Sequence, residues 1–312
     1  MKPVLFASTK PLERAENIRA LYEAYEGEKE FVQVNGCRRH PAIQSGAYSL
    51  MVIDEFPTET PGKCVMIWHA IQGGKTIGLD QPYPYYHAWQ ATLMDCIITS
   101  GHGVMKMFAK CSGLPEEKIL PLGMPRTDAY VGKHKGDGQT VLAEKRAYLY
   151  APTFRVGDET PFPDINWKWL DENLTDGEVL AVKAHTMTGK FGIGRYRHII
   201  EIPSEEPSTP YLIDCDALVT DYSSILFDGY LLGKPAVLFE KRKGYTETRG
   251  MYLRYPDEYC SRYCTGEEEL LHLLRTSYGL KNTEKSVLRL VADGCDGNAT
   301  ERVCMLIEGM AG

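Results

Sequence analysis

Residues 214–239, with the sequence DCDALVTDYSSILFDGYLLGKPAVLF, decide the fold class of this chain. The apolar run ALVT at 217–220 predicts a short buried strand, and ILFDGYLLG at 225–233 is apolar at helical spacing. A proline then opens a second strand-like run, PAVLF, at 235–239. The stretch therefore predicts strand, polar corner, helix and strand in direct succession, which is typical of an α/β fold.

The polar corner DYSS at 221–224 lies where the predicted helix begins. Ser223 and Ser224 can offer hydroxyl and backbone N–H groups to a phosphate there, and the positive end of the helix dipole favours the same ligand. Asp221 and the two serines can equally cap the first N–H groups of the helix. The corner alone leaves both hypotheses open, and other motifs have to decide between them.

Short apolar runs alternate with helical ones along most of the chain. Strand-like runs are expected at 4–8, 31–34, 49–56, 63–68, 95–100, 118–123, 147–154, 178–185 and 198–203, besides the two in the opening stretch. The carboxy-terminal part is mainly helical. Alternation of this kind predicts layered α/β domains with mostly parallel sheets.

A polar, glycine-bearing segment between Tyr130 and Ala147 is the expected domain boundary. We expect one Rossmann-like domain at 1–135 and a second at 136–312, whose final helices are free to pack back on the first domain. Two such domains imply a cleft between them. Because ligands of open parallel sheets bind outside the carboxyl ends of the strands, polar residues just after strands carry the most weight.

Composition limits the classes of function. With 312 residues, 43% hydrophobic and 25% charged, the chain is typical of a globular protein large enough for two domains. A net charge of −7 argues against a nucleic-acid binder, whereas a small phosphorylated ligand needs only a local group of cations. No apolar run approaches the roughly 18 residues of a membrane helix, and we expect a cytoplasmic protein. The nine cysteines lack zinc-ribbon spacing, so we expect reduced thiols and no metal site.

Two segments of the first expected domain combine a strand end with cationic residues. His69 follows an apolar run directly and precedes a glycine-bearing loop with Lys75, so it can act as a general base or merely bond the turn. In GMPRTD, Arg126 can clamp a phosphate, and Asp128 can orient that arginine or cap the next helix. An ion pair at a domain edge is the alternative for the arginine and the aspartate.

Two segments of the second expected domain have the same form. YLYAPTFR ends a strand with Thr153 and Arg155, and the arginine faces the ligand if that strand is central. AVKAH supplies Lys183 and His185, which alternate along a strand, point the same way and suit an anion. A solvated strand end is the alternative in both cases. The DCD at 214–216 begins a strand rather than ending one, so we assign it to structure and not to a metal.

Taken together and in this order, WHAIQGGK, GMPRTD, YAPTFR, KAH and DYSSILFD resemble the CDP-glycerol glycerophosphotransferase family, the primases and polymerases of teichoic acid synthesis. The resemblance implies a GT-B-like α/β architecture of two Rossmann-like domains with a cleft between them. It places the acceptor near the first domain and the CDP-linked donor mainly on the second. It also implies the reaction, in which an acceptor hydroxyl attacks the β-phosphorus of CDP-glycerol, takes up glycerol phosphate and releases CMP.

The resemblance also implies roles for individual residues. His69 would be the general base on the acceptor hydroxyl, and His185 would bind and neutralise the pyrophosphate of the donor. Arg126, Ser223 and Ser224 correspond to donor-phosphate ligands, which favours the phosphate hypothesis for the serine corner. The further donor-binding candidates are Asp128, Thr153, Arg155 and Lys183, and Lys75 is the candidate of the acceptor or phosphate loop. Phosphoryl transfer needs alignment and charge stabilisation, so we expect no metal and no tightly bound cofactor.

Several departures leave the substrates open. Ala70, Ile71 and Gln72 stand where the family has Gly-Thr-Pro, and Thr186 stands where it has proline, so contacts to the acceptor or polyol can differ. CDP-ribitol or another CDP-polyol is an alternative donor, and a capsule or other glycan is an alternative acceptor. A GT-B glycosyltransferase or epimerase that uses a UDP-sugar, or a catalytically silent nucleotide-binding homologue, are the alternatives of other classes. For a lipid-linked acceptor we expect peripheral contact with the cytoplasmic face of the cell membrane, and we expect no nucleic-acid partner.

Overall fold

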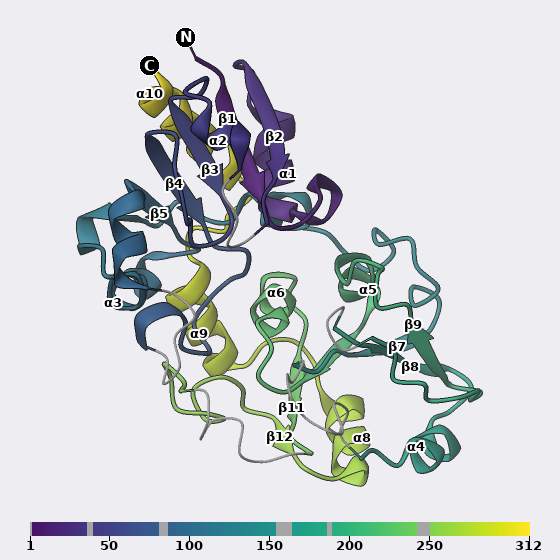
Figure 1. Cartoon of the computed structure of the whole chain (residues 1–312). Helices are drawn as coiled ribbons and strands as arrows, with labels where there is room; N and C mark the ends of the chain where they lie inside the picture. Colours follow the sequence, from purple (N-terminus) through teal and green to yellow (C-terminus); the bar gives the residue numbers. More distant parts are fainter. Residues whose placement is uncertain (1, 36–39, 81–86, 154–163, 186–188, 242–249) are drawn as a thin grey trace. The chain divides into compact units, whose positions relative to one another are not determined.

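The computed structural model describes residues 2–35, 40–80, 87–153, 164–185, 189–241 and 250–312. The chain forms two compact units, each built on its own parallel sheet (Figure 1). The first unit combines Met1–Val131 with Arg289–Gly312, and the second is Gly132–Leu288. The last residues of the chain therefore belong to the same compact unit as its amino-terminal part.

Among the described residues, the sheet of the first unit has six parallel strands in the order β2, β1, β3, β4, β5, β6. The strands are Val4–Ser8 (β1), Lys29–Gln33 (β2), Leu50–Ile53 (β3), Lys63–Ile67 (β4), Cys96–Ile98 (β5) and Ile119–Leu120 (β6). β1, β3 and β5 are buried along their whole length. Such continuous apolar runs are typical of parallel strands that are covered on both faces.

Two helices from opposite ends of the chain meet in the first unit. α1 (Glu16–Ala24) packs against α10 (Ala299–Ala311), the last helix of the chain (Figure 1). Asn17 of α1 donates a hydrogen bond to Trp68 O at 2.9 Å and accepts one from Arg126 N–H at 3.0 Å. One buried amide thus holds two segments of the candidate site. The other helices of the unit are α2 (Pro41–Gln44), α3 (Met105–Ser112) and the 3-10 helices η1 (Leu12–Arg14), η2 (Gly78–Asp80), η3 (Ala88–Leu93), η4 (His102–Val104), η5 (Glu116–Lys118) and η6 (Pro125–Ala129).

The described part of the second unit contains a second parallel sheet, in the order β12, β11, β10, β7, β8, β9. The strands are Arg146–Tyr150 (β7), Glu178–Lys183 (β8), Ile199–Ile202 (β9), Ala217–Thr220 (β10), Ala236–Phe239 (β11) and Tyr263–Cys264 (β12). The helices are α4 (Trp167–Asn173), α5 (Thr209–Asp214), α6 (Ile225–Leu231), α8 (Glu267–Thr276) and α9 (Asn282–Ala292), whose last residues belong to the first unit. Tyr148, Val219 and Phe239 from the sheet and Leu270 from α8 form part of its apolar core.

The strand–corner–helix–strand prediction for 214–239 is confirmed, because β10, α6 and β11 follow one another there. Most of the predicted strands are shorter than expected, and for two of them the earlier end matters for the candidate site. β3 ends at Ile53 and β8 ends at Lys183, so the polar residues beyond them lie outside the sheet. β12 was not expected, since two residues carry no pattern and become a strand only by pairing with β11.

Each sheet has one place where the direction of strand addition reverses. In the first unit it lies between β1 and β3, because the chain adds β2 on one side of β1 and then continues on the other. In the second unit it lies between β7 and β10 for the same reason. Ligands of open α/β sheets bind outside the carboxyl ends of the strands at such a switch point. The fold therefore points to two places where functional side chains should gather.

The DCD motif fastens the start of the second unit, as its assignment to structure predicted. The carboxylate of Asp214, which is fully buried, accepts hydrogen bonds from the backbone N–H groups of Gly136, Gly138 and Thr140 at 2.7–3.0 Å. Asp216 accepts a hydrogen bond from the N–H of Ala147 at 2.8 Å. The two carboxylates thus hold the segment that leads into β7.

We predict that Asp214→Ala destabilises the protein by about 3 kcal/mol, because several backbone donors lose a charged acceptor in a buried place. Urea unfolding measures this loss. Asp137→Ala is the matched control, since Asp137 is exposed and accepts one backbone hydrogen bond, from His134. Equal losses for the two variants would contradict the fastening role of Asp214.

Candidate functional site

Polar side chains gather at the switch point of the first unit. Asp54 follows β3 and is only 2% exposed, and its Oδ2 accepts a hydrogen bond from Ser8 Oγ, at the end of β1, at 3.1 Å. Burial raises the pKa of Asp54, while the Ser8 hydrogen bond and the charge of Lys10 oppose that rise. Ser8 Oγ also accepts a hydrogen bond from the N–H of Lys10 at 3.0 Å. The ends of β1 and β3 are therefore tied together by polar contacts.

His69 lies next to this point, just after β4. Because β3 and β4 are parallel and Ile53 is paired with Met66, the residues that follow the two strands come close together. His69 Nδ1 is 3.7 Å from Glu55 Oε1. The ring of Trp68 stacks on the imidazole at a centroid distance of 4.5 Å and an interplanar angle of 33°. The imidazole is thus packed on one face and, with 37% of the side chain exposed, still open to solvent.

The surroundings make His69 a neutral group. Burial lowers its pKa well below the usual value, and the positive charges of Lys10 and Arg126 lower it further. The backbone of Asp54 acts in the opposite direction and raises the pKa, while the charge of Lys75 lowers it further. The imidazole is therefore unprotonated at pH 7 and able to accept a proton, as a general base requires.

Glu55 is the acidic partner in this group. Burial and the neighbouring charge of Asp54 raise its pKa to about 7, while Lys10 opposes the rise. The carboxyl group therefore changes charge near neutral pH. A titrating carboxyl beside a neutral histidine at the end of parallel strands is typical of a functional site.

Arg126 belongs to the same unit as His69. Its Nη1 lies 3.6 Å from Glu16 Oε2 and donates a hydrogen bond to Tyr130 Oη at 3.2 Å, and the side chain is 8% exposed. The ion pair considered as an alternative for this arginine is therefore present. Its charge nevertheless acts on the imidazole of His69, so the arginine lies within electrostatic reach of the base.

Asp128 caps a helix. Its Oδ1 accepts a hydrogen bond from Ala299 N–H at 3.2 Å, and its Oδ2 accepts one from Thr300 N–H at 2.7 Å. Both oxygens therefore face the first turn of α10. The structure gives this aspartate the capping role that the sequence left as one of two options, although the helix it caps is the last of the chain and not the next one.

Several residues of the loop after His69 are buried. Ile71 is fully buried and Gln72 is 6% exposed, while Lys75 is partly exposed. Two of the three loop residues that depart from the family motif are thus packed inside the unit. Lys75 contributes positive charge at the imidazole.

At the switch point of the second unit, one carboxylate joins two strand ends. Asp221 Oδ1 accepts hydrogen bonds from Thr153 N–H at 2.7 Å and from Tyr222 N–H at 2.6 Å. Thr153 follows β7 and Asp221 follows β10, so the bond spans the place where the strand order reverses. The hydroxyl of Thr153 is buried and has no hydrogen-bond partner within the described part of the chain. An unsatisfied buried hydroxyl at a switch point is a candidate ligand contact.

The serines of the corner make at most one weak capping contact to the residues that the structure describes. α6 begins at Ile225, and Ser224 makes no side-chain capping hydrogen bond. Ser223 Oγ accepts a long hydrogen bond of 3.5 Å from Ile225 N–H. Asp221, which was also considered as a cap, accepts hydrogen bonds from the N–H groups of Thr153 and Tyr222. Within the described residues, the capping bond that a serine makes is therefore long, and Asp221 links two strand ends.

An acidic residue after β11 also fixes the corner, through hydrogen bonds to tyrosine hydroxyl groups. Glu240 accepts hydrogen bonds from the hydroxyl groups of Tyr222 and Tyr263, the latter at 2.7 Å. The ring of Tyr255 packs on Tyr222 at a centroid distance of 4.6 Å. Tyr222 is thus fixed through both its N–H and its hydroxyl group, which holds the adjacent Ser223 in place.

Lys183 and His185 do not form the joint grip that the sequence predicted. The ammonium group of Lys183, which is 7% exposed, donates hydrogen bonds to Pro203 O at 3.2 Å and to Ser204 O at 2.9 Å. β8 ends at Lys183, so His185 lies beyond the strand and is exposed. The alternation argument fails because the strand stops too early. Arg155 lies outside the described residues.

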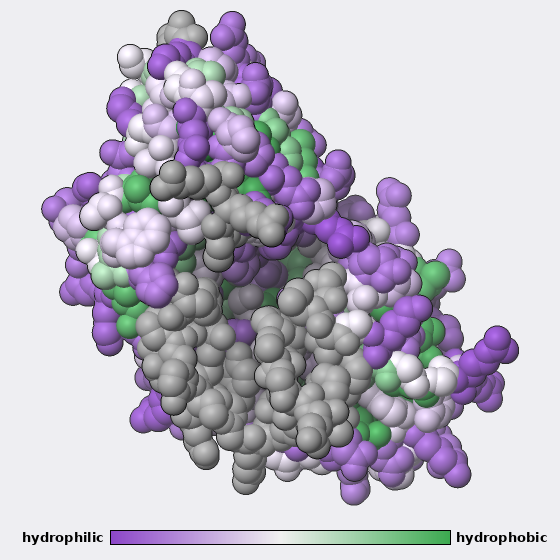
Figure 2. Space-filling view, in the orientation of Figure 1, coloured by the Kyte–Doolittle hydropathy of each residue, from purple (hydrophilic) through white to green (hydrophobic). Residues whose placement is uncertain are grey.

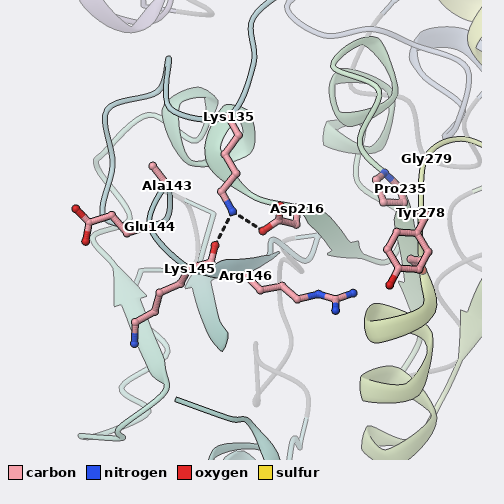
Figure 3. A pocket seen from close by; sticks show the side chains of 10 residues that line it. Lys135, Ala143, Glu144, Lys145, Arg146, Asp216, Pro235, Tyr278 and Gly279 are labelled. Atoms are coloured by element: carbon pink, nitrogen blue, oxygen red, sulfur yellow. Dashed lines mark hydrogen bonds and ion pairs between the residues drawn. The ribbon is translucent and has the colours of Figure 1, made fainter. Parts of the chain in front are cut away.

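The second unit also has a cavity of about 620 Å³ at the amino ends of β7, β10 and β11 (Figure 3). The Lys135 ammonium group there contacts Asp216 Oδ2 and Lys145 O, both at 2.5 Å. The Arg146 guanidinium donates a hydrogen bond to Arg275 O at 2.7 Å. These cations are held by the protein itself, and the cavity lies at the end of the strands opposite Thr153.

Sequence reasoning missed Lys10, Asp54 and Glu55. The signal was present, because an acidic pair follows the apolar run LMVI directly. The prediction of one strand over residues 49–56 hides this signal, because it places both carboxyl groups inside the strand. Only the end of β3 at Ile53 moves the two carboxyl groups to the edge of the sheet.

Two Rossmann-like units with polar groups at their switch points define a GT-B-like α/β protein, which confirms the predicted fold class. The sequence profile of the CDP-glycerol:poly(glycerophosphate) glycerophosphotransferase family matches residues 27–309. The chain belongs to this family of transferases, and the resemblance drawn from its motifs is confirmed.

Curated relatives are identical to the chain at about a quarter of the aligned positions. The teichoic acid poly(ribitol-phosphate) polymerase of Bacillus spizizenii is 26% identical over 262 residues, which are 77% of this chain and 42% of that protein. The teichoic acid glycerol-phosphate primase of Bacillus subtilis is 26% identical over 276 residues, 80% of this chain and 68% of the relative. The chain thus spans less than half of the first relative and about two thirds of the second.

Solved structures share the fold. The wall teichoic acid polymerase TagF, as one variant, superposes with a TM-score of 0.79 at 18% identity, covering 99% of this chain and 89% of the other. Staphylococcus aureus MnaA in complex with UDP has a TM-score of 0.64 at 13% identity, covering 99% and 96%. At these identities the likeness concerns the fold.

We predict that Lys10→Gln raises the pKa of His69, because a positive charge that opposes protonation of the imidazole is removed. Titration of the ring resonances by NMR measures the change. Lys2→Gln serves as control, since Lys2 is exposed and bonds Gly46 O. A pKa of His69 that stays the same or falls in Lys10→Gln would refute this electrostatic account.

Proposed function

We propose that this protein transfers glycerol phosphate, or a related polyol phosphate, from a CDP-linked polyol to a hydroxyl group of a lipid-linked or glycan acceptor, with release of CMP. Membership of a glycerophosphotransferase family supports the reaction class. The names of the relatives, which include glycerol-phosphate and ribitol-phosphate enzymes of teichoic acid synthesis, support a polyol phosphate as the transferred group. A TagF variant has been solved after a soak with CDPG, which supports a CDP-linked donor.

The observation that carries the proposal is the arrangement at His69. A neutral imidazole follows a central parallel strand, lies beside cations and is partly open to solvent. Such a group can take a proton from an attacking hydroxyl, while the surrounding cations attract a phosphorylated ligand. We assign His69 as the general base.

In the proposed mechanism the first unit activates the acceptor. The acceptor hydroxyl loses its proton to His69 and attacks the β-phosphorus of the donor. Lys75 and Arg126 are proposed to stabilise the negative charge that gathers on the phosphoryl oxygens in the transition state.

The second unit is proposed to hold the donor. Ser223, Ser224 and Thr153 offer hydroxyl groups at the carboxyl ends of β7 and β10, and the exposed His185 is proposed to neutralise the pyrophosphate. Arg155 remains a donor-binding candidate on the strength of the motif. Since phosphoryl transfer depends on alignment, the rigid contacts of Asp221 are expected to matter for the rate as well as for binding.

The lipid-linked acceptor and contact with the cytoplasmic face of the membrane belong to the same proposal. None of the described helices is both long and apolar enough to cross a bilayer. Figure 2 shows mostly hydrophilic residues on the described surface of the face drawn, with hydrophobic residues in small groups. The membrane contact that we propose is peripheral.

We predict that the protein releases CMP from CDP-glycerol or CDP-ribitol in the presence of a glycan or lipid-linked acceptor. His69→Ala should lower this turnover by roughly 10²- to 10⁴-fold, because the general base is lost, while donor binding stays within a few-fold. Chromatographic detection of CMP and UDP measures the reaction, and calorimetry measures binding.

His102→Ala is the control for this variant, since His102 is an exposed histidine of the same unit that pairs with Asp293 at 2.9 Å. Full turnover in His69→Ala would remove it from the mechanism. Release of UDP from UDP-sugars in place of CMP would identify a sugar transferase or epimerase, and binding without any turnover would identify a silent homologue.

A second prediction concerns the corner. Ser223→Ala combined with Ser224→Ala should weaken donor binding by about 10-fold or more, because two hydroxyl groups that bond the pyrophosphate are lost. Ser208→Ala is the matched control, since Ser208 also precedes a helix, α5, and also makes no capping hydrogen bond. If both variants bind the donor like the wild type, the serines are not its ligands.

A further inference from the structure

Glu55 is a titratable group beside the proposed base that the mechanism leaves without a role. Its Oε1 lies 3.7 Å from His69 Nδ1, and 31% of its side chain is exposed. It comes from the end of β3, whereas the histidine comes from the end of β4. The contact therefore depends on the pairing of two neighbouring strands and not on closeness in sequence.

We propose that Glu55 is a positioning residue for His69, whose carboxylate orients the imidazole and pairs with the imidazolium formed during transfer. The inference rests on the proposed function. In the transfer step the proton of the acceptor hydroxyl moves to the His69 imidazole, and the hydroxyl oxygen forms a bond to the β-phosphorus. The bond between that phosphorus and the oxygen of CMP breaks, and its electron pair leaves with CMP. The positive charge gained by the imidazole then faces Glu55.

The packing of the imidazole fixes the plane of the ring but not the positions of its two nitrogens, and Glu55 can restrict these positions. Trp68 stacks on the imidazole and sets the plane of the ring, but stacking does not decide which nitrogen points where. Nδ1 of His69 is shielded from solvent and makes no hydrogen bond to any residue that the structure describes. A carboxylate at 3.7 Å is too far for a hydrogen bond and near enough for an ion pair, so the contact tightens when the imidazole becomes charged.

The positive charges around the ring disfavour the imidazolium, and an anion beside the ring would offset this effect. Lys10 after β1, Arg126 on η6 and Lys75 in the loop of the histidine all disfavour the imidazolium. A base in these surroundings accepts a proton more readily if a carboxylate opposes the cations. Asp54 is tied to Ser8, so its carboxylate is held at the end of β1. Glu55 supplies the opposing charge next to Nδ1.

The same contact predicts a pH dependence. Burial and the charge of Asp54 raise the pKa of Glu55 to about 7, with Lys10 acting in the opposite direction. As the pH falls through this value, Glu55 becomes neutral and no longer pairs with the imidazolium of His69. Turnover is therefore expected to fall on the acid side with a midpoint near the pKa of Glu55, although the histidine itself titrates far lower.

A structural role as partner of Lys10 is the competing explanation for Glu55, and variants separate the two. Glu55→Gln should lower kcat at least about tenfold at pH 8, leave the KM for the donor within about threefold and remove the acid limb near pH 7. Glu55→Asp, which keeps the charge, should recover part of kcat and retain an acid limb. Glu59→Gln is the matched control, since Glu59 lies in the same segment and bonds the His40 N–H and Gln44.

An NMR titration tests the contact without turnover. In the wild type the ring resonances of His69 should move with a midpoint near pH 7 as Glu55 titrates, and this step should be absent in Glu55→Gln and present in Glu59→Gln. A wild type without CMP release would overturn the proposed function, and the titration would still decide whether Glu55 controls the imidazole. Absence of the step, its persistence in Glu55→Gln, or an unchanged kcat and acid limb in that variant would overturn the inference. Thermal melting identifies a variant that fails to fold, in which case Glu55→Asp and the wild-type titration decide.

Discussion

The parallel pairing of β3 with β4 is the interaction on which the candidate base depends. With Ile53 opposite Met66, the chain after each strand emerges at the same edge of the sheet. Glu55 and His69 then meet although they belong to different loops. A shift of this register would separate the carboxyl group from the imidazole, and the electrostatics of both groups would change together.

In the second unit, too, the ends of neighbouring parallel strands bring functional groups together, but here a carboxylate bonded to the backbone makes the connection. β7 and β10 are neighbours because the strand order reverses there, and Asp221 bonds the backbone beyond both. Fixed N–H groups and hydroxyl groups then stand at the edge of the sheet where open α/β folds bind ligands. Candidate side chains that lie at this edge of the sheet are available to a ligand. Candidate side chains that are bonded elsewhere have a structural role. Lys183, bound to two carbonyl groups beyond β9, belongs to the fold.

Much of the architecture could be predicted because continuous apolar runs and polar corners are local signals. The strands and the corner at 221–224 follow from such runs, and the order of five motifs led to the correct family. The pair Asp54 and Glu55 escaped prediction because the ends of strands depend on pairing with neighbours. β12 escaped for the same reason, since its two residues carry no pattern. The role of Asp128 was a choice between two local options that only α10, far along the chain, resolves.

The sequence by itself determined the α/β class, the parallel sheets, the family and the identity of His69, Ser223 and Ser224 as candidates, because hydrophobic periodicity and motif order are written along the chain. The tertiary structure decided which charges surround the histidine, that the last helix joins the first unit, and which contacts the residues of the corner make. The physical reason is the distance along the sequence over which each kind of interaction acts. Propensity and burial pattern act between near neighbours in sequence, whereas pKa values and ion pairs depend on distances between residues that only folding brings together.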